Sequence, residues 1–475
     1  MIATAERRWW PLAVPLAVIL GTALLVAMQS SAQRPAMLLV LAVQAAMVLL
    51  SFSRPVWLLG ALVVGQLTAA NYYMGVGSLQ MSTRLLWTVV TPVLMVPYIS
   101  RFGLDLGPRA RRVVLPALAF FALTLLANAV YTDMDYTFKY FRQTAFFLAA
   151  ILLTPALVRE EKDVKILGLV AIAVGTVSGF LAILQHYAFK GAPVITILPD
   201  VIKNGRPAGL TEGAVQLSYY LPTILLPMLS VYLLKGVSSK GRWFLVVPAL
   251  IMGLAMYFTY TRSAPVALAV GGLAMGLFFT GRLKREYLLV LLLVGGGFWW
   301  YTGMKGNRFS MGFTEESSGA SRLVLWQAGM KMAMGHPLLG VGHKDFEVAS
   351  VGYGSSISSY YMELQGAGDI LGREKVHNDF LNIWLSFGTL ALILFLILLG
   401  AVFWNFIEAF RRASGPFLKA FSLGCAGAVA GYAATAFLHN VMDTSAQLFI
   451  FAGLSLALTR MAYGRELHHR KEAID

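Results

Sequence analysis

Three arginines and one histidine in the second half of the chain are residue types that could bind a phosphorylated group and promote its transfer. Arg206 lies in NGRPAGLTEG, Arg262 lies in FTYTRSAPVAL, and Arg322 opens the segment SRLVLWQAGMKMAMG. The histidine, His377, lies in VHNDFLNIWLSFGTLAL. A guanidinium keeps its charge and binds phosphate bidentately, and an imidazole titrates near pH 6.5 and can take a proton from a hydroxyl group. This set predicts a site where cations hold a phosphate while a base activates a nucleophile.

The composition places these residues in a membrane protein. The chain has 475 residues, of which 58% are hydrophobic and 13% charged, and its mean hydropathy is +0.69. Soluble proteins carry roughly 25% charged residues, so a cytosolic enzyme, a disordered protein and a secreted disulfide scaffold are excluded. The single cysteine, Cys425, cannot form a disulfide within the chain. The net charge of +15 follows from basic residues in short loops, as the positive-inside rule requires, and we expect no nucleic-acid partner.

Apolar segments of about 17 to 25 residues predict membrane-spanning helices. We expect an all-α polytopic membrane protein with about 14 spans, or 12 if the two weakest segments, 36–52 and 144–158, do not cross. Arg7 and Arg8 precede an apolar stretch long enough to span, which predicts a first anchor and not a cleaved signal. The predicted spans are 10–27, 36–52, 56–72, 85–100, 113–130, 144–158, 166–187, 215–234, 243–260, 264–280, 287–302, 380–407, 418–438 and 446–462.

The loops between these segments predict an orientation and four regions. Most of the 38 Lys and Arg residues fall in alternate loops, which we place in the cytoplasm together with both termini. Residues 1–189 are then N-terminal membrane helices, and 190–302 are central helices with arginine-bearing external loops. Residues 303–377 form a large external loop subdomain of short helices, and 378–475 form C-terminal helices and a basic tail.

This topology puts the three arginines and His377 on one face of the membrane. Two predicted spans separate Arg206 from Arg262 and two more separate Arg262 from His377, and an even number of crossings returns the chain to the same side. Arg322 shares the long external loop with His377. A lone arginine in such a place is more often an interfacial anchor that snorkels to lipid headgroups. Four basic residues on the face that is poor in positive charge favour recognition of a lipid-linked pyrophosphate instead.

The long external loop contains one clear helical pattern. Apolar residues at Leu323, Trp326, Met330 and Met334 recur on one face, and Gly335 is placed to cap the helix at its C-terminal end. We expect this helix to lie on the outer leaflet or to roof the bundle.

The segment around His377 resembles the O-antigen ligase and O-antigen polymerase superfamily. The signature of that family is a histidine followed by Asn, Ser or Gln, then nine residues and a glycine. His377, Asn378 and Gly388 match it, while Ala391 departs from the Gly, Thr or Tyr that often ends the pattern in the family.

Other segments extend this resemblance over about residues 200 to 450 of the chain. The family has an Arg-x-x-x-Trp helix followed by a His-Pro-Leu-Leu-Gly-Val-Gly turn, which is similar to Arg322, Trp326 and HPLLGVG (336–342) in this sequence. Its Ser/Thr-Arg-Ser segment is matched around Arg262, and its arginine-containing loop is matched more loosely around Arg206.

The resemblance implies glycosyl transfer from an undecaprenyl-pyrophosphate-linked donor on the periplasmic face of the bacterial inner membrane. In the ligase branch the acceptor is the lipid A–core oligosaccharide. His377 would be the general base, and Arg206 and Arg262 would stabilise the pyrophosphate leaving group. Direct attack predicts inversion at the anomeric carbon, without a metal ion or a cofactor. The expected substrate-binding residues are Arg322, Asn378, Trp326, Lys139 and Arg142.

Two further motifs receive a structural interpretation. Asp133-Met134-Asp135 matches the Asp-x-Asp with which many nucleotide-sugar transferases hold a divalent metal, but it lies in an external loop, and we interpret it as part of a solvated rim. Lys139 and Arg142 follow it in the same loop. His439-Asn440 repeats the His-Asn dipeptide without a glycine at the required distance, and we interpret it as structural.

Other functions remain open at this stage. An O-antigen polymerase would use the same donor to extend a lipid-linked glycan, and a protein O-oligosaccharyltransferase would use a protein acceptor. A transporter or lipid flippase belongs to a different class and would need ionisable residues at mid-membrane depth. Beyond donor and acceptor, membrane lipids are the expected partners.

Overall fold

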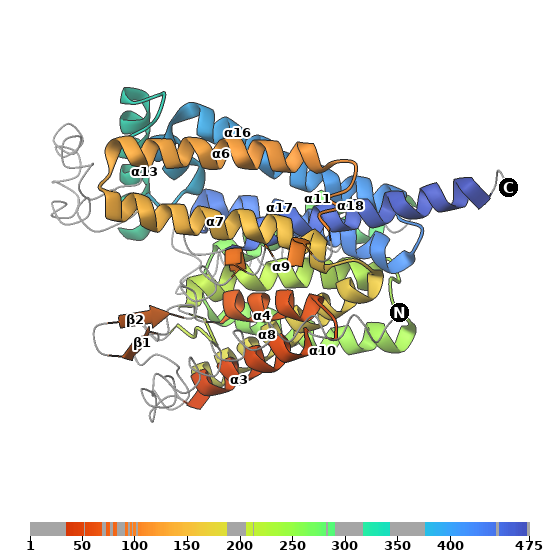
Figure 1. Cartoon of the computed structure of the whole chain (residues 1–475). Coiled ribbons are helices and arrows are strands. Elements are labelled where there is room, and N and C mark those ends of the chain that lie inside the picture. Colours follow the sequence, from red (N-terminus) through yellow and green to blue (C-terminus); the bar gives the residue numbers. More distant parts are fainter. Residues whose placement is uncertain are drawn as a thin grey trace.

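The computed structural model is a bundle of long helices that run along a common direction (Figure 1). One further helix, α13, lies across one end of this bundle. The structure describes residues 35–51, 53–68, 73–76, 79–82, 91–93, 96, 98–100, 103–187, 206–211, 213–281, 284–289, 317–342, 376–442 and 446–472. The predicted span 10–27, most of the predicted span 287–302 and most of the predicted loop subdomain 303–377 lie outside these residues.

Most helices follow the predicted segments closely, but the helix expected at 144–158 begins at Met134, so Lys139 and Arg142 lie on a helix and not in the predicted external loop. In chain order they are α3 (Pro35–Leu50), α4 (Val56–Leu67), α6 (Ala110–Tyr131), α7 (Met134–Leu157), α8 (Glu161–Tyr187), α9 (Ala214–Leu233), α10 (Ser239–Phe258), α11 (Ser263–Gly276), α13 (Ser317–Gly335), α16 (Asp379–Arg412), α17 (Pro416–Leu438) and α18 (Gln447–Glu472). Seven of them, α6, α7, α8, α9, α10, α16 and α17, are long and apolar enough to cross a membrane. The helical membrane-type architecture is therefore confirmed, and the count of about 14 spans stays a prediction.

A short hairpin departs from the expected all-α fold. Strands β1 (Tyr73–Val76) and β2 (Leu79–Ser82) pair in antiparallel fashion, with Tyr73 opposite Ser82 and Val76 opposite Leu79. The hairpin follows α4, which ends at Leu67, five residues before the end of the predicted span 56–72.

Helix α17 lies at the centre of the bundle, where it packs against α9, α11 and α16. Its small residues allow this close approach. A methyl group added to Gly427 would come within 2.9 Å of the carbonyl oxygen of Gly271 on α11, and one added to Gly431 would come within 2.8 Å of the carbonyl oxygen of Ala267. The small-x-x-x-small spacing of Gly427 and Gly431 therefore serves helix packing, as small residues do at membrane helix interfaces.

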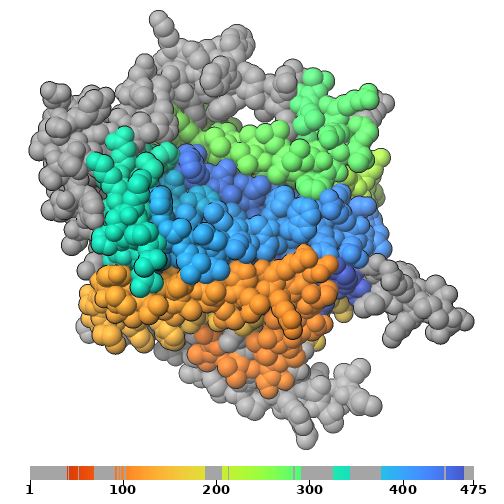
Figure 2. Space-filling view, turned by 90° about the horizontal axis from the view of Figure 1, so that it is seen from above, coloured from red at the N-terminus to blue at the C-terminus, as the bar shows by residue number. Residues whose placement is uncertain are grey.

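Helix α16 consists of two parts that meet at Gly388. The backbone of Gly388 has φ 85° and ψ 176°, far from helical values, so residues 379–387 form a separate short helix. The second part, residues 389–412, rises about 36 Å at 1.5 Å per residue, which exceeds the roughly 30 Å hydrocarbon core. The span proper thus starts after the kink. The short first part carries the His377 segment at its beginning, and α13 packs against it (Figure 2).

Candidate active site

His377 precedes the first turn of α16 in an unusual backbone conformation. Its φ of 51° lies in the left-handed region, which costs on the order of 1–2 kcal/mol for a residue with a side chain. The next residue, Asn378, is the N-cap, and its side-chain oxygen accepts a hydrogen bond of 3.0 Å from the backbone N–H of Leu381. The left-handed turn and the cap together fix where the chain enters α16. Non-glycine residues held in this conformation are frequent at functional sites.

Asp379 joins this helix start to the connection between α17 and α18. Its carboxylate is fully buried and accepts hydrogen bonds of 2.9 Å from the backbone N–H groups of both Val441 and Met442. These two residues directly follow His439-Asn440. The imidazole rings of His377 and His439 consequently lie with their centroids 6.4 Å apart and perpendicular to each other.

The pKa of His439 depends on the charged residues around it. Its side chain is 8% exposed, and burial, with smaller electrostatic contributions from Arg322, His377 and Arg206, lowers its pKa to about 3. The structure therefore places Arg206, Arg322 and His377 near the same imidazole. His439 itself is neutral at pH 7. We call these four residues the His377 cluster.

Arg206 also contacts the turn that carries Arg262. Its guanidinium donates to the carbonyl oxygen of Thr259 at 2.8 Å and to the hydroxyl of Thr261 at 2.6 Å. Arg262 is the next residue and the N-cap of α11. Tyr260, inside this turn, has a left-handed φ of 50°. Arg206 thus binds the turn that immediately precedes Arg262, although the two arginines are 56 positions apart in the sequence.

The loop that bears Arg206 is held by α8. The side-chain oxygen of Gln185 accepts hydrogen bonds from the backbone N–H groups of Ala208 at 3.0 Å and Gly209 at 2.9 Å, and its nitrogen donates to the carbonyl of Gly209. The hydroxyl of Ser178 accepts from the N–H of Leu210 at 2.9 Å. Gly209 has φ 59°, and a side chain there would collide with Ser178. These contacts fix the position of Arg206.

The HPLLGVG turn docks into the kink of α16. The N–H of Thr389 donates to the carbonyl of Pro337, and those of Val341 and Gly342 donate to Leu385 and Ser386, over 2.8–2.9 Å. A side chain on Gly388 would collide with the carbonyl of Leu338. The nine residues between Asn378 and Gly388 thus form the short first part of α16. This short helix ends where the HPLLGVG turn binds the kink.

Helix α13 ends at Gly335, as predicted, but packs through a face that we did not predict. Its buried residues are Leu325, Ala328, Met332 and Ala333, which contact Val376, Leu381 and Leu385. Met330 and Met334, which we expected on the packing face, are exposed. The error arises because α13 carries apolar side chains on more than one face, so periodicity alone cannot identify the buried one. The helix roofs this end of the bundle, as expected.

Trp326 occupies the border of the buried face of α13. Its indole ring lies against Phe437, with centroids 5.4 Å apart in an edge-on arrangement. Its N–H is buried and has no hydrogen-bond partner among the described residues. Trp326 thus packs against the end of α17, two residues before His439. The contact supports the cluster, and its predicted role in substrate binding remains a prediction, as does that of Asn378, whose oxygen caps α16.

The remaining predicted residues lie on α7. Lys139 is exposed and extends over the ring of Tyr136 at 5.2 Å. Arg142 is partly buried, and its Nε has no hydrogen-bond partner among the described residues. None of the contacts between described side chains joins either residue to the His377 cluster. Asp133, in the Asp-x-Asp motif, caps α7 by accepting from the N–H of Tyr136 at 2.7 Å, which gives this motif a structural role.

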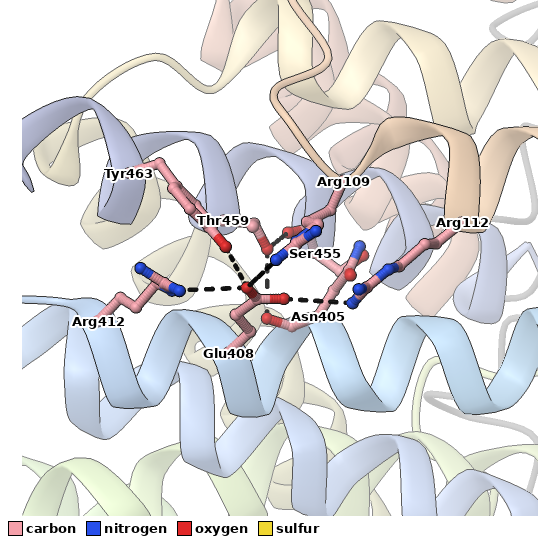
Figure 3. A network of polar contacts seen from close by, with 8 residues as sticks. All are labelled: Arg109, Arg112, Asn405, Glu408, Arg412, Ser455, Thr459 and Tyr463. Atoms are coloured by element: carbon pink, nitrogen blue, oxygen red, sulfur yellow. Dashed lines mark hydrogen bonds and ion pairs between the residues drawn. The ribbon is translucent and has the colours of Figure 1, made fainter. Parts of the chain in front are cut away.

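A second polar cluster lies at the opposite end of α16 (Figure 3). Glu408 accepts from Arg109 at 3.0 Å and forms ion pairs with Arg112 at 3.4 Å and Arg412 at 3.5 Å. The hydroxyl of Tyr463 donates to the same carboxylate. The hydrogen bond to Glu408 raises the pKa of Arg109. This Glu408 cluster ties α6, α16 and α18 together through ion pairs and a hydrogen bond to one shared carboxylate.

Sequence reasoning missed three residues that shape the site. His439 was interpreted as structural, although its repeat of the His-Asn dipeptide was a usable signal. Asp379 follows the signature directly and could have been suspected from that place. Gln185 gave no signal, because its function depends on a loop that lies 23 residues away.

Comparison with known proteins agrees with the motifs. No curated protein matches the chain. The family model described as O-antigen ligase matches residues 247–396, which contain Arg262, Arg322, His377 and Gly388. Arg206 and His439 lie outside the matched segment, and the structure brings them to it. The match agrees with the resemblance seen in the motifs, and residues 247–396 are similar to the O-antigen ligase family.

Proposed function

We propose that the protein is an O-antigen ligase, which transfers a glycan from undecaprenyl-pyrophosphate to the lipid A–core oligosaccharide. The family match and the membrane-type helices support a glycosyltransferase of this superfamily. The observation that carries the proposal is the His377 cluster, in which Arg206 and Arg322 lie near His439 and the rings of His377 and His439 are 6.4 Å apart.

Each residue of this site suits one part of the reaction. The acceptor hydroxyl oxygen attacks the anomeric carbon, and the bond from that carbon to the pyrophosphate oxygen breaks. The imidazole of His377 takes the hydroxyl proton. Arg206 and Arg262 stabilise the negative charge that develops on the departing pyrophosphate, and Arg322 binds phosphate on the acceptor. A single displacement inverts the anomeric centre, and the leaving group needs no acid because it is already stabilised.

The charge distribution supports a periplasmic location for this site. Arg54, Arg159, Lys235 and Arg411 lie at the ends of α4, α7, α9 and α16 that are away from the His377 cluster. The positive-inside rule places that end in the cytoplasm. The His377 cluster then faces the periplasm, where the lipid-linked donor and the lipid A–core acceptor would meet.

The test is transfer by the purified protein in liposomes that contain a lipid-linked glycan donor. With rough lipopolysaccharide present, we expect glycan to appear on the lipid A–core without ATP. Elongation of the donor without lipopolysaccharide would indicate a polymerase, attachment to an added protein would indicate a protein transferase, and movement of donor across the bilayer without bond formation would indicate transport. Each of these three outcomes would overturn the ligase proposal.

A variant pair tests the role of His377. His377→Asn keeps a side chain that tolerates the left-handed backbone but removes the base, so transfer should fall about 100- to 10,000-fold. His336, an exposed histidine in the HPLLGVG turn, supplies the control, and His336→Asn should keep near wild-type transfer. Equal rates for His377→Asn and wild type would remove His377 from the mechanism.

A further inference from the structure

A cavity of about 310 Å³ lies between α4, α8, α9, α10, α17 and α18. Its lining is almost wholly apolar and includes Leu167, Ile224, Leu245, Phe421 and Ile450. None of the residues of the His377 cluster lines it. The cavity is therefore separate from the candidate active site, and its surface suits a hydrocarbon chain.

The cavity has the depth of one membrane leaflet. On α9 its lining extends from Tyr220 to Val231, about 17 Å at 1.5 Å per residue, and half of the hydrocarbon core is about 15 Å. Its inner end is closed by polar side chains, where Gln447 donates to Thr223. Its outer end reaches Lys165 and Gly241, in the first turns of α8 and α10. These turns lie at the same end of the bundle as the Glu408 cluster.

Basic residues neighbour the lining residue Gly241 at that outer end, although they do not line the cavity themselves. Lys240 and Arg242 flank Gly241 in the first turn of α10, whose N-cap is Ser238. Lys240 is exposed, and the Nε of Arg242 is buried without a hydrogen-bond partner among the described residues. Lys165 is balanced by Glu161 at 2.7 Å, so Lys240 and Arg242 carry the excess positive charge. A phosphate at this place would meet two cations and the positive end of α10.

Aromatic side chains mark the level of the membrane interface here. Trp243 and Phe244 are 69% and 62% exposed, and Phe244 also lines the cavity. Exposed aromatic residues of this kind are enriched at the headgroup level of a bilayer. The apolar cavity thus begins where acyl chains begin, and the basic residues lie where headgroups lie.

We propose that this cavity is a binding site for an anionic phospholipid of the leaflet at the Glu408 end. One acyl chain fills the space between α8, α9, α10 and α17, and the phosphate binds Lys240 and Arg242. The bound lipid holds α10 against α17 and stabilises the bundle. This site is independent of the proposed transfer reaction.

The experiment measures lipid retention and thermal stability of the delipidated protein in detergent. Phosphatidylglycerol should bind and raise the melting temperature, because a ligand that binds only the folded state stabilises it. Phosphatidylcholine, with the same acyl chains, and glycerol phosphate, without them, should bind much more weakly. Equal binding of both phospholipids would refute recognition of charge, and equal binding of glycerol phosphate would refute the role of the acyl chain.

Two variants with matched controls locate the site. Lys240→Gln combined with Arg242→Gln should weaken phosphatidylglycerol binding about 30-fold, since each basic residue near an anionic surface contributes roughly 5-fold. Arg111→Gln, an exposed arginine on α6, should leave binding unchanged. If the double variant binds as tightly as wild type, the mouth of the cavity does not hold the phosphate.

A cavity-filling variant tests the acyl chain. A side chain on Gly168 would point towards Phe421 at 3.7 Å, so Gly168→Leu should fill part of the cavity and reduce lipid binding at least about tenfold. Gly253→Leu on α10 adds the same bulk where nothing lies within 4 Å and should bind lipid as wild type does. Wild-type binding by Gly168→Leu would overturn the proposal. If Gly168→Leu does not fold, the charge variants decide the question.

Discussion

Arginine side chains gather at both ends of α16, and the two clusters differ in the group at their centre. At its C-terminal end, three arginines and a tyrosine converge on the carboxylate of Glu408, whose side chain is 12% exposed. At its N-terminal end, the neighbouring charges that act on His439 are those of Arg322, His377 and Arg206, and all three lower its pKa. One cluster contains its own counter-charge at the centre, whereas the other has a neutral imidazole there.

This difference separates a structural site from a site suited to a ligand. A carboxylate shared by several arginines satisfies charge inside the protein and joins the helices that bear it. At the His377 end, the buried carboxylate of Asp379 binds the backbone of Val441 and Met442, and we expect the guanidinium groups of Arg206 and Arg322 to bind an anion such as a pyrophosphate. The comparison predicts that substitutions near His377 impair transfer more than stability, and that those near Glu408 do the reverse.

After the loss of His377 itself, the largest expected effect follows from Arg206→Gln. Loss of the guanidinium should reduce transfer about 100- to 1,000-fold, as removal of one charge-stabilising group does in other enzymes. The lost hydrogen bonds to Thr259 and Thr261 should cost only about 1 kcal/mol each in stability. Rates in liposomes and melting temperatures in detergent provide the measurement. Arg206→Lys, which keeps the charge but not the planar fork, should retain part of the activity; a wild-type rate in Arg206→Gln would contradict the comparison.

Gly388→Ala should have the next largest effect, on stability. The methyl group would meet the backbone of Leu338 and would force a side chain into a left-handed conformation, which together cost about 2–5 kcal/mol. Gly400 lies on the same helix with nothing within 4 Å, and Gly400→Ala should be neutral or stabilising by up to about 1 kcal/mol. Thermal unfolding of the two variants measures the difference. Equal melting temperatures would mean that the turn does not lock the kink.

Glu408→Gln tests the opposite end of the helix. It leaves Arg109, Arg112 and Arg412 close together without their shared carboxylate. Because these arginines are partly exposed, we expect a loss of about 1–3 kcal/mol, less than for a fully buried pair. Transfer per folded molecule should be unchanged. A large fall in the rate of the folded variant would show that the two ends are coupled through α16.

His439 makes the stability of the His377 end depend on pH. Its pKa is about 3 in the folded protein and near 6.5 when unfolded. A lowered pKa means that the unfolded state binds protons first, so the contribution is complete above pH 6.5 and is lost as the pH falls towards 3. Between pH 7 and 5 the protein should lose about 1–2 kcal/mol. His439→Gln should flatten this part of the profile; an unchanged profile would place the titration elsewhere.

How far the sequence could predict this structure depends on the range of the interactions involved. Helix positions follow from local hydropathy, and α16 and α17 appear close to the predicted segments 380–407 and 418–438. The signature glycine was recognised by spacing, but its reason, a backbone contact with Leu338, depends on a turn that is 50 residues away.

Contacts between helix ends were harder to predict, because they join residues that lie far apart in the sequence. His439 and His377 meet because Asp379 binds the backbone after α17, and no periodicity indicates which helix ends lie together. The topological argument did predict that Arg206, Arg322 and His377 share one face, since counting crossings requires no knowledge of packing.

The smallest expected effect comes from Arg112→Gln and sharpens the comparison most. Arg112 is the most exposed partner of Glu408, with a side chain that is 46% exposed and 3.4 Å from the carboxylate, so its loss should cost less than about 1 kcal/mol. Arg109, at 3.0 Å with two donors, should cost more when changed to Gln. If Glu408 holds the helices by several partly redundant ion pairs, the double variant should lose more stability than the sum of the two single losses. Additive losses, measured by a double-mutant cycle, would instead mean that each arginine binds Glu408 independently.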